Sequence, residues 1–216
     1  MKTILTFIFG LSFTFIHSQP RTITVDSEQL EKSDYLESNA IKLHLLEFTS
    51  SDFSLYYEKA LFSKISAEVG IGLTFADDIG HISSPTTNGP INPDNKLGYS
   101  FTAAIRFYPS EILNQFYIAP EYKFRKYNWN REFSNYFGFT DVNGVRADES
   151  RVHSIPRITF GYVVYLFEYV FVDFHFGMGI NSRTETLYNP FTSQIEVNKL
   201  SPRPKVNGGF KIGFIF

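Results

Sequence analysis

Ionisable side chains recur at every second position within apolar segments, and this spacing is the feature of the chain most suggestive of chemistry. Asp173 and His175 are such a pair, separated by Phe174 and flanked by Val172 and Phe176. Residues two apart on a strand share one face, so this carboxylate and this imidazole suit a metal site or an acid–base pair. Because no third ligand is in view, a buried structural ion pair is the preferred interpretation.

Two other groups of residues have types that occur in active sites or metal sites. His153 and Ser154 match the base and nucleophile of a lipid A-modifying barrel enzyme, but neighbouring residues on a strand point to opposite faces. Asp77, Asp78 and His81 suit a divalent cation, although a solvated turn is the simpler interpretation. The sequence therefore predicts no catalytic, cofactor-binding or metal site, and we expect the chain not to be an enzyme.

The elements that position these residues are segments in which apolar and polar residues alternate. Strict alternation is typical of a strand with one apolar face. Eight such strands are predicted: Ile41–Leu45, Phe53–Glu58, Ala67–Phe75, Leu97–Phe107, Phe116–Arg125, Arg157–Leu166, Val172–Asn181 and Lys205–Phe216.

The connections between these strands alternate in length, apart from a brief early link at Thr49–Asp52. Short turns are predicted at Ser63–Lys64, Pro109–Glu111 and Phe167–Tyr169, and long polar loops at Asp77–Asn95, Asn130–Glu149 and Tyr188–Pro204. Outer-membrane barrels have short periplasmic turns and long extracellular loops. We therefore predict an all-β fold, an eight-stranded antiparallel transmembrane up-and-down β-barrel. Pro120, inside a strand, predicts a bulge or local irregularity there.

The apolar faces are expected to contact lipid. A soluble, lipocalin-like barrel also alternates, but its large apolar side chains would overfill an eight-stranded lumen. The opposite faces carry small residues and charges of both signs, which suits a narrow interior. We expect these charges to form a structural network that fills the lumen, so that charge reversal at Glu121 destabilises the barrel. The predicted network comprises Glu58, Glu68, Arg106, Glu121, Lys123, Arg157, Asp173, His175 and Lys211, with Lys42 and Arg125 on the same faces.

The beginning of the chain predicts export. Residues 1–18 combine Lys2 with an apolar run too short to span a membrane comfortably, which is typical of a cleaved secretory signal peptide. Residues 19–39 are expected to be a polar periplasmic lead-in, and residues 40–216 the barrel. The chain contains no cysteine, and its net charge of −2 gives no basic field for nucleic acid. Its 24 Phe and 13 Tyr residues favour strands.

The chain also resembles a known class of proteins. The first hairpin reads Leu43-x-Leu45, then Phe53-Ser54-Leu55-Tyr56-Tyr57-Glu58-Lys59-Ala60-Leu61, and the last strand carries Phe210, Ile212, Phe214 and Phe216. These segments resemble the small outer-membrane barrels of the OmpA-transmembrane, OmpX and opacity type. The resemblance implies a location in the outer membrane, and it implies that the last strand is the signal read by the barrel-assembly machinery.

The function predicted from these features is structural or recognition-based and is carried by the long extracellular loops, without catalysis. The expected partners are outer-membrane lipid, the assembly machinery and an extracellular ligand, with no cofactor and no nucleic acid. A narrow passive pore, a lipid A-modifying enzyme and a soluble periplasmic ligand-carrying barrel remain as alternatives.

Overall fold

The computed structural model describes residues 39–75, 94–133, 145–189 and 192–216. The predicted signal peptide, nearly all of the lead-in, and Asp77, Asp78 and His81 lie outside the described residues. Among the described residues, no helix is long and apolar enough to cross a membrane. The elements are β1 (Asn39–His44), η2 (Leu46–Ser50), β2 (Asp52–Phe62), β3 (Ile65–Thr74), β4 (Asp94–Phe107), β5 (Gln115–Phe133), β6 (Val145–Tyr165), β7 (Val170–Asn189) and β8 (Gln194–Ile215).

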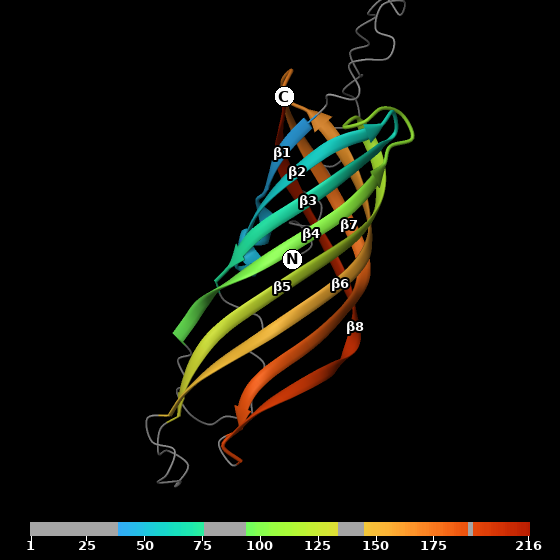
Figure 1. Cartoon of the computed structure of the whole chain (residues 1–216). Helices are drawn as coiled ribbons and strands as arrows, with labels where there is room; N and C mark the ends of the chain where they lie inside the picture. Colours follow the sequence, from blue (N-terminus) through green and yellow to red (C-terminus); the bar gives the residue numbers. More distant parts are fainter. Residues whose placement is uncertain (1–38, 76–93, 134–144, 190–191) are drawn as a thin grey trace, which may run out of the picture. The chain divides into compact units, whose positions relative to one another are not determined.

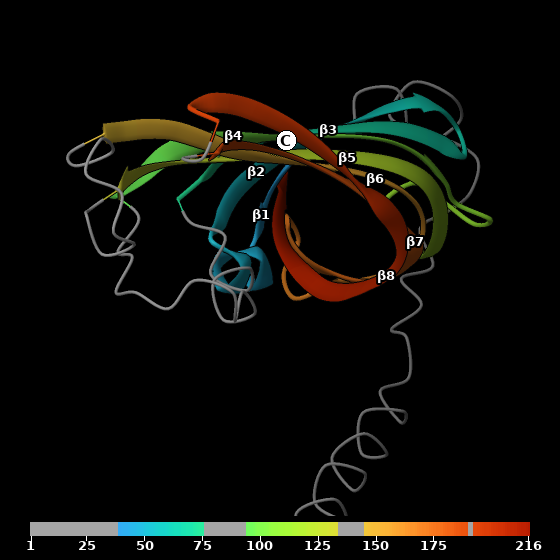
Figure 2. The same cartoon turned by 90° about the horizontal axis from the view of Figure 1, so that it is seen from below.

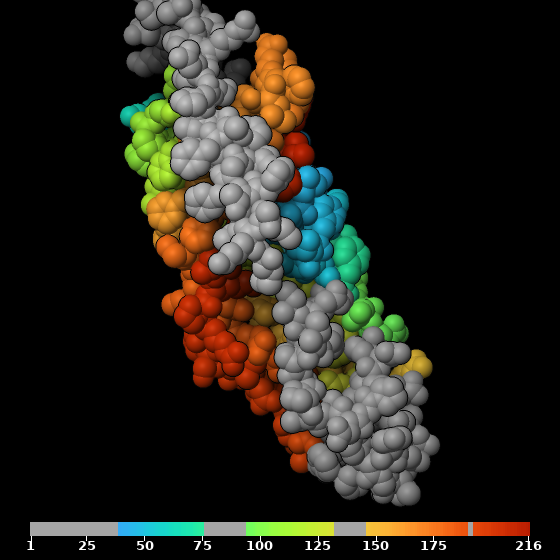
Figure 3. Space-filling view, turned by 180° about the vertical axis from the view of Figure 1, so that it is seen from behind, coloured from blue at the N-terminus to red at the C-terminus, as the bar shows by residue number. Residues whose placement is uncertain are grey.

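The eight strands form one antiparallel sheet that closes into a barrel in sequence order (Figure 1). The ring closes where β8 pairs with β1, from Ala40↔Ile215 to His44↔Lys211. Figure 2 shows the barrel from below, and Figure 3 shows the blue residues of β1 and η2 beside the red residues of β8. This geometry confirms the predicted eight-stranded up-and-down barrel, including the hairpin between β6 and β7 that has no typical turn residue.

The outer and inner faces of the barrel have opposite chemistry. Large apolar side chains cover the outside, and Ile71 and Phe174 are 67% and 50% exposed. Charged side chains occupy the inside, where Lys42 and Asp173 are fully buried. This arrangement inverts that of a soluble protein, and an apolar outer surface around a polar lumen is the pattern of a barrel that crosses a membrane. The predicted outward orientation of the apolar faces is confirmed, and their contact with lipid stays a prediction.

Aromatic rings that point into the lumen stand directly opposite glycines on the neighbouring strand. The register pairs are Tyr56↔Gly70, Tyr117↔Gly161 and Phe171↔Gly213. A methyl group at Gly161 would lie 2.2 Å from the Tyr117 ring, closer than atoms can approach. An eight-stranded lumen is only as wide as its side chains, so each large ring requires an empty position beside it.

Four strands are much longer than predicted. Strands β5 to β8 contain 19, 21, 20 and 22 residues, and in Figure 1 they extend past the lower ends of β1 to β3. The predicted loop at Asn130–Glu149 is wrong at both ends, because β5 continues to Phe133 and β6 begins at Val145. The predicted loop at Tyr188–Pro204 is also wrong, because β7 and β8 form a hairpin paired out to Asn189↔Gln194.

The reason for these errors is that the outward faces of the strands change character. On β5 they are apolar from Phe116 to Phe124 and then become polar at Lys126, Asn128 and Asn130. At about 3.3 Å per residue and a tilt of about 40°, the apolar stretch covers roughly 23 Å, close to the apolar band of membrane barrels. Beyond that height the outer side of a strand faces water, so its outward residues are mostly polar. The alternation of apolar and polar residues, by which the sequence predicts a strand, then disappears. We call the parts of β5 to β8 beyond this height the extension.

The prediction at Pro120 is confirmed as a local irregularity and not as a bulge. The register of β4 with β5 is the same on both sides of Pro120, from Ala104↔Glu121 to Phe107↔Ile118, but the ladder omits the pair Ile105↔Pro120. The early link at Thr49–Asp52 is not a simple turn, because β1 ends at His44 and a 3₁₀-helix, η2, follows it.

The pairing of glycines with lumen rings predicts a specific cost for added side-chain volume. Gly161→Ala should lower the free energy of unfolding by about 1–3 kcal/mol, because the Tyr117 ring beside it has no space to move into. Urea titration followed by heat-modified gel mobility measures this change. Gly208→Ala is the matched control, because its methyl group would meet nothing closer than 3.6 Å. Equal stability of the two variants would show that lumen crowding is not the constraint.

Candidate functional site

The part of the lumen near the short turns holds a cluster of three cations and three carboxylates. Lys42 from β1 contacts Glu58, and its Nζ lies 3.0 Å from Glu68 Oε2 and 3.2 Å from Asp173 Oδ2. Arg106 from β4 contacts the same three carboxylates, with Nη1 2.7 Å from Asp173 Oδ2. Lys211 from β8 lies 2.6 Å from Glu68 Oε1. The inner cluster therefore joins strands from around the barrel through its centre.

Tyrosine hydroxyls complete the inner cluster. The Tyr108 hydroxyl donates to Glu58 Oε1 at 2.8 Å, and the Tyr117 hydroxyl donates to Asp173 Oδ1 at 2.7 Å. The Arg106 guanidinium stacks 4.2 Å above the Tyr117 ring. These contacts supply the additional hydrogen bonds and packing that a buried ionic group needs.

A second cluster fills the lumen around η2 and joins Glu47 and Asp52 to Lys123 and Arg125. Lys123 contacts Glu47 and lies 3.0 Å from Asp52 Oδ2, while Arg125 lies 3.0 Å from Glu47 Oε1 and 2.7 Å from Asp52 Oδ2. Burial alone would raise the pKa of the Glu47 carboxyl, but Lys123 and Arg125 outweigh it and hold that pKa well below its usual range. Glu47 therefore anchors η2 inside the barrel as a carboxylate.

A third contact, between Glu121 and Arg157, cross-links β5 with β6, and the Thr159 hydroxyl donates to Glu121 Oε2 at 3.0 Å. Taken together, the three groups bring six basic and six acidic side chains together, and each group is neutral by itself. We call these twelve residues the lumen network: Lys42, Glu47, Asp52, Glu58, Glu68, Arg106, Glu121, Lys123, Arg125, Arg157, Asp173 and Lys211.

The structure places most of the lumen residues named from the sequence in this network, with His175 beside it. Sequence reasoning missed Glu47 and Asp52, because neither lies in a predicted strand: Glu47 follows the first predicted strand, and Asp52 ends the early link. A signal for them was present. The predicted lumen residues held six basic but only four acidic side chains. Two further carboxylates were needed for neutrality in a medium where unpaired charge is very costly.

His175 pairs with another histidine and not with Asp173. Its Nε2 lies 3.0 Å from His44 Nε2, and the Glu47 N–H donates to His44 Nδ1 at 3.1 Å. An accepting Nδ1 leaves the proton of a neutral His44 on Nε2, so His44 donates to His175. Among the described residues, no group of three His, Asp or Glu side chains is placed to hold a metal ion.

His153 and Ser154 face opposite sides of β6. His153 Nδ1 lies 3.2 Å from Asn181 Oδ1 on the inner side, whereas Ser154 Oγ lies 2.9 Å from the Tyr122 hydroxyl on the outer side. The two residues therefore make no nucleophile–base contact with each other.

The inner side of the extension has its own polar contacts. Trp129 Nε1 donates to Glu149 Oε2 at 2.7 Å, and Arg131 Nη2 lies 2.9 Å from the same oxygen. Farther along β6, Arg151 Nε lies 2.8 Å from Glu185 Oε1 on β7. These contacts tie β5, β6 and β7 together beyond the apolar band.

Comparisons with known proteins leave the family open. No protein-family model matches the chain, and no curated protein matches it. A solved structure, the outer membrane protease OmpT from Escherichia coli, matches with a TM-score of 0.41 and 11% identity, over 83% of this chain and 92% of that chain. The resemblance to the OmpA and OmpX type is not matched by any family model and stays a prediction.

This comparison corrects one prediction. We expected the chain not to be an enzyme, and the solved barrel that it matches is a protease. The expectation of a non-catalytic protein is therefore withdrawn. A likeness at this TM-score assigns no activity to this chain.

The lumen network predicts a strong response to charge reversal. Glu121→Arg would place two guanidinium groups together at a buried site, and the free energy of unfolding should fall by about 3–5 kcal/mol. Urea titration followed by heat-modified gel mobility measures the loss. The double variant Glu121→Arg, Arg157→Glu restores an ion pair between the same strands and should recover at least half of the loss. An unchanged single variant would show that the network does not stabilise the barrel.

Proposed function

We propose that this protein is a sealed outer-membrane barrel that holds the extension above the cell surface as a recognition surface. The observation that carries the proposal is the change of the outward faces from apolar to polar partway along β5 to β8. A barrel whose only role was to span the membrane would need no strands beyond that height, whereas a rigid scaffold for binding would.

The filled lumen favours this function over a passive pore. Lys42, Asp173 and Tyr117 are fully buried, and Arg106 is 2% exposed. Water and ions would have to cross a region in which cations and carboxylates from opposite strands already contact each other. An eight-stranded barrel has little interior volume beyond that taken by its own side chains.

The outer side of the extension offers a surface for a partner. Ile195 and Val197 on β8 are each 62% exposed and lie beyond the apolar band, where lipid does not cover them. Exposed apolar residues surrounded by polar ones are typical of protein interaction sites. The recognition role thus lies on the segment predicted as the loop Tyr188–Pro204, which forms part of the β7–β8 hairpin.

Export and assembly are parts of the same proposal. Residues 1–18 supply a cleavable signal peptide, and residues 19–39 remain as a periplasmic lead-in. Phe210, Ile212, Phe214 and Phe216 recur at every second position and provide the segment that the barrel-assembly machinery reads. A soluble periplasmic barrel is disfavoured, because its outer surface would carry exposed rings such as Phe174.

The topology is testable with introduced cysteines, because the natural chain contains none. Thr186→Cys in the extension should react with a membrane-impermeant maleimide on intact cells. Lys64→Cys in the turn between β2 and β3 should react only after the outer membrane is permeabilised. Labelling of position 64 on intact cells would show that the short turns face the outside and would contradict the proposed orientation. Protection of position 186 on intact cells would show that the extension is not exposed at the cell surface.

Recognition is testable with the full-length protein in lipid nanodiscs on arrays of immobilised glycans and extracellular peptides. Binding should fall about tenfold or more in the Ile195→Ser, Val197→Ser double variant, because both lost contacts are apolar anchors. Thr184→Ala, on the same outer side of β7, is the control and should bind normally. The recognition proposal would be contradicted if the protein bound nothing above the level of empty nanodiscs. If it also gave ohmic steps in planar bilayers, a pore function would be favoured instead.

A further inference from the structure

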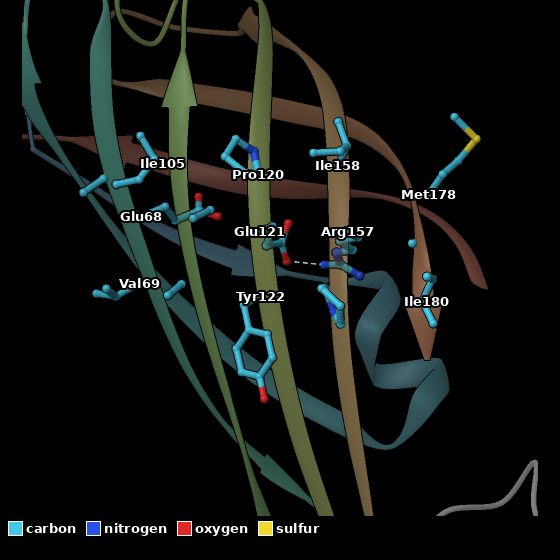
Figure 4. A pocket seen from close by; sticks show the side chains of 15 residues that line it. Glu68, Val69, Ile105, Pro120, Glu121, Tyr122, Arg157, Ile158, Met178 and Ile180 are labelled. Atoms are coloured by element: carbon cyan, nitrogen blue, oxygen red, sulfur yellow. Dashed lines mark hydrogen bonds and ion pairs between the residues drawn. The ribbon is translucent and has the colours of Figure 1, made fainter. Parts of the chain in front are cut away.

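An apolar groove of about 680 Å³ crosses the lipid-facing side of the barrel from β3 to β7 (Figure 4). It exists because small or ring-closed residues replace large ones at its floor, namely Ala67, Ala103, Pro120 and Pro156. Ile105 and Ile180 lie at its two sides. Its volume falls within the range of sites that bind small molecules.

The two prolines interrupt the hydrogen-bond ladders that bound the groove. The register of β6 with β7 is the same before and after Pro156, as the pairs Ser154↔Ser182 and Arg157↔Gly179 show. This register places Pro156 opposite Ile180, but the ladder omits that pair. The Leu166 N–H donates to the Val170 carbonyl of this hairpin. Along an antiparallel ladder, every second residue of a strand donates its N–H to the same partner strand. Position 156 is an even number of residues from Leu166 and is therefore a donating position toward β7, but proline has no N–H to donate.

Pro120 has the same effect on the other side of the groove. The register of β4 with β5 places it opposite Ile105, and the ladder omits that pair as well. The main-chain carbonyls of Ile105 and Ile180 therefore both lose a ladder donor at the edges of an apolar groove. In contact with lipid, no water is present to replace the missing donor, so a carbonyl there favours a ligand that brings one.

Of the two carbonyls, that of Ile180 lies near the outer surface of the membrane. Ile180 is ten residues along β7, and the next outward side chain is the polar Ser182. The Tyr122 hydroxyl and Ser154 Oγ, 2.9 Å apart, lie on the same outer side beside this end of the groove. By contrast, Ile105 lies two residues from the end of β4 at the short-turn side of the barrel.

We propose that this groove binds an outer-leaflet lipid whose acyl chain carries a hydroxyl group close to the headgroup. The chain lies over Ala103, Pro120 and Pro156, and its hydroxyl donates to the Ile180 carbonyl. The apolar lining selects a hydrocarbon chain, and the missing ladder donor selects a chain that carries a hydrogen-bond donor. The site is separate from the extension and does not depend on its function.

The test compares two probe lipids that differ only in the hydroxyl group, N-(3-hydroxytetradecanoyl)glucosamine and N-tetradecanoylglucosamine. Native mass spectrometry of the detergent-purified full-length protein measures retention of each. The wild type should prefer the hydroxylated lipid by roughly three- to tenfold, the effect of one hydrogen bond. Pro156→Ala returns an N–H to the Ile180 carbonyl, and the preference should fall to about one.

Two further variants complete the test. Pro120→Ala restores the donor only at Ile105, so the preference should persist. Ala103→Phe fills the groove and should reduce retention of both lipids, whereas Val172→Phe, on the outer face away from the groove, should not. Equal retention of the two lipids by the wild type, or a preference that survives Pro156→Ala, would overturn the proposal. Since Pro156→Ala adds a ladder hydrogen bond, loss of folding is not expected to obscure its result.

Discussion

The structure depends on local neutralisation of charge inside a narrow lumen. Twelve ionisable side chains meet there in three groups, and each group contains as many cations as carboxylates. In a lumen that excludes water, an unpaired charge would destabilise the fold far more than an ordinary buried contact stabilises it. This constraint accounts for the position of η2. Without Glu47 in that helix and Asp52 just after it, Lys123 and Arg125 would have no carboxylate partners in the network.

The same constraint divides the barrel into parts with different roles. Where lipid surrounds the wall, the lumen is filled by ion pairs and by rings that stand over glycines, and the outer surface is apolar. Where β5 to β8 continue past the apolar band, the outer surface becomes mostly polar, with Ile195 and Val197 exposed on β8. There the inner face is tied together by contacts such as Trp129 with Glu149 and Arg151 with Glu185. Rigidity in the extension therefore comes from cross-strand polar contacts, whereas within the membrane it comes from a packed, neutral core.

The sequence predicted the membrane-embedded part of the fold well, because lipid outside and ion pairs inside impose strict alternation on each strand. The strand from Phe116 to Arg125 shows that pattern throughout. The prediction fails where the environment on both sides of the strand is polar: the sequence predicts a strand end at Arg125 and a loop from Asn130, whereas β5 continues to Phe133. It also failed at Glu47, which lies in a 3₁₀-helix without a strand period and becomes part of the lumen only through tertiary structure. Pro120 predicts a bulge or a local irregularity, and the structure has the irregularity: the register continues and only the ladder pair with Ile105 is lost.

The ring is closed unevenly. The ladder between β1 and β8 runs from Ala40↔Ile215 to His44↔Lys211, with main-chain hydrogen bonds to one further residue at each end, whereas that between β7 and β8 continues to Asn189↔Gln194. A force that pulls β8 out of the sheet would therefore break far fewer hydrogen bonds along its edge with β1 than along its edge with β7. We expect mechanical rupture to begin at the β1–β8 seam. The barrel is thus held closed by the short ladder between its first and last strands, although its later strands pair with one another over much greater lengths.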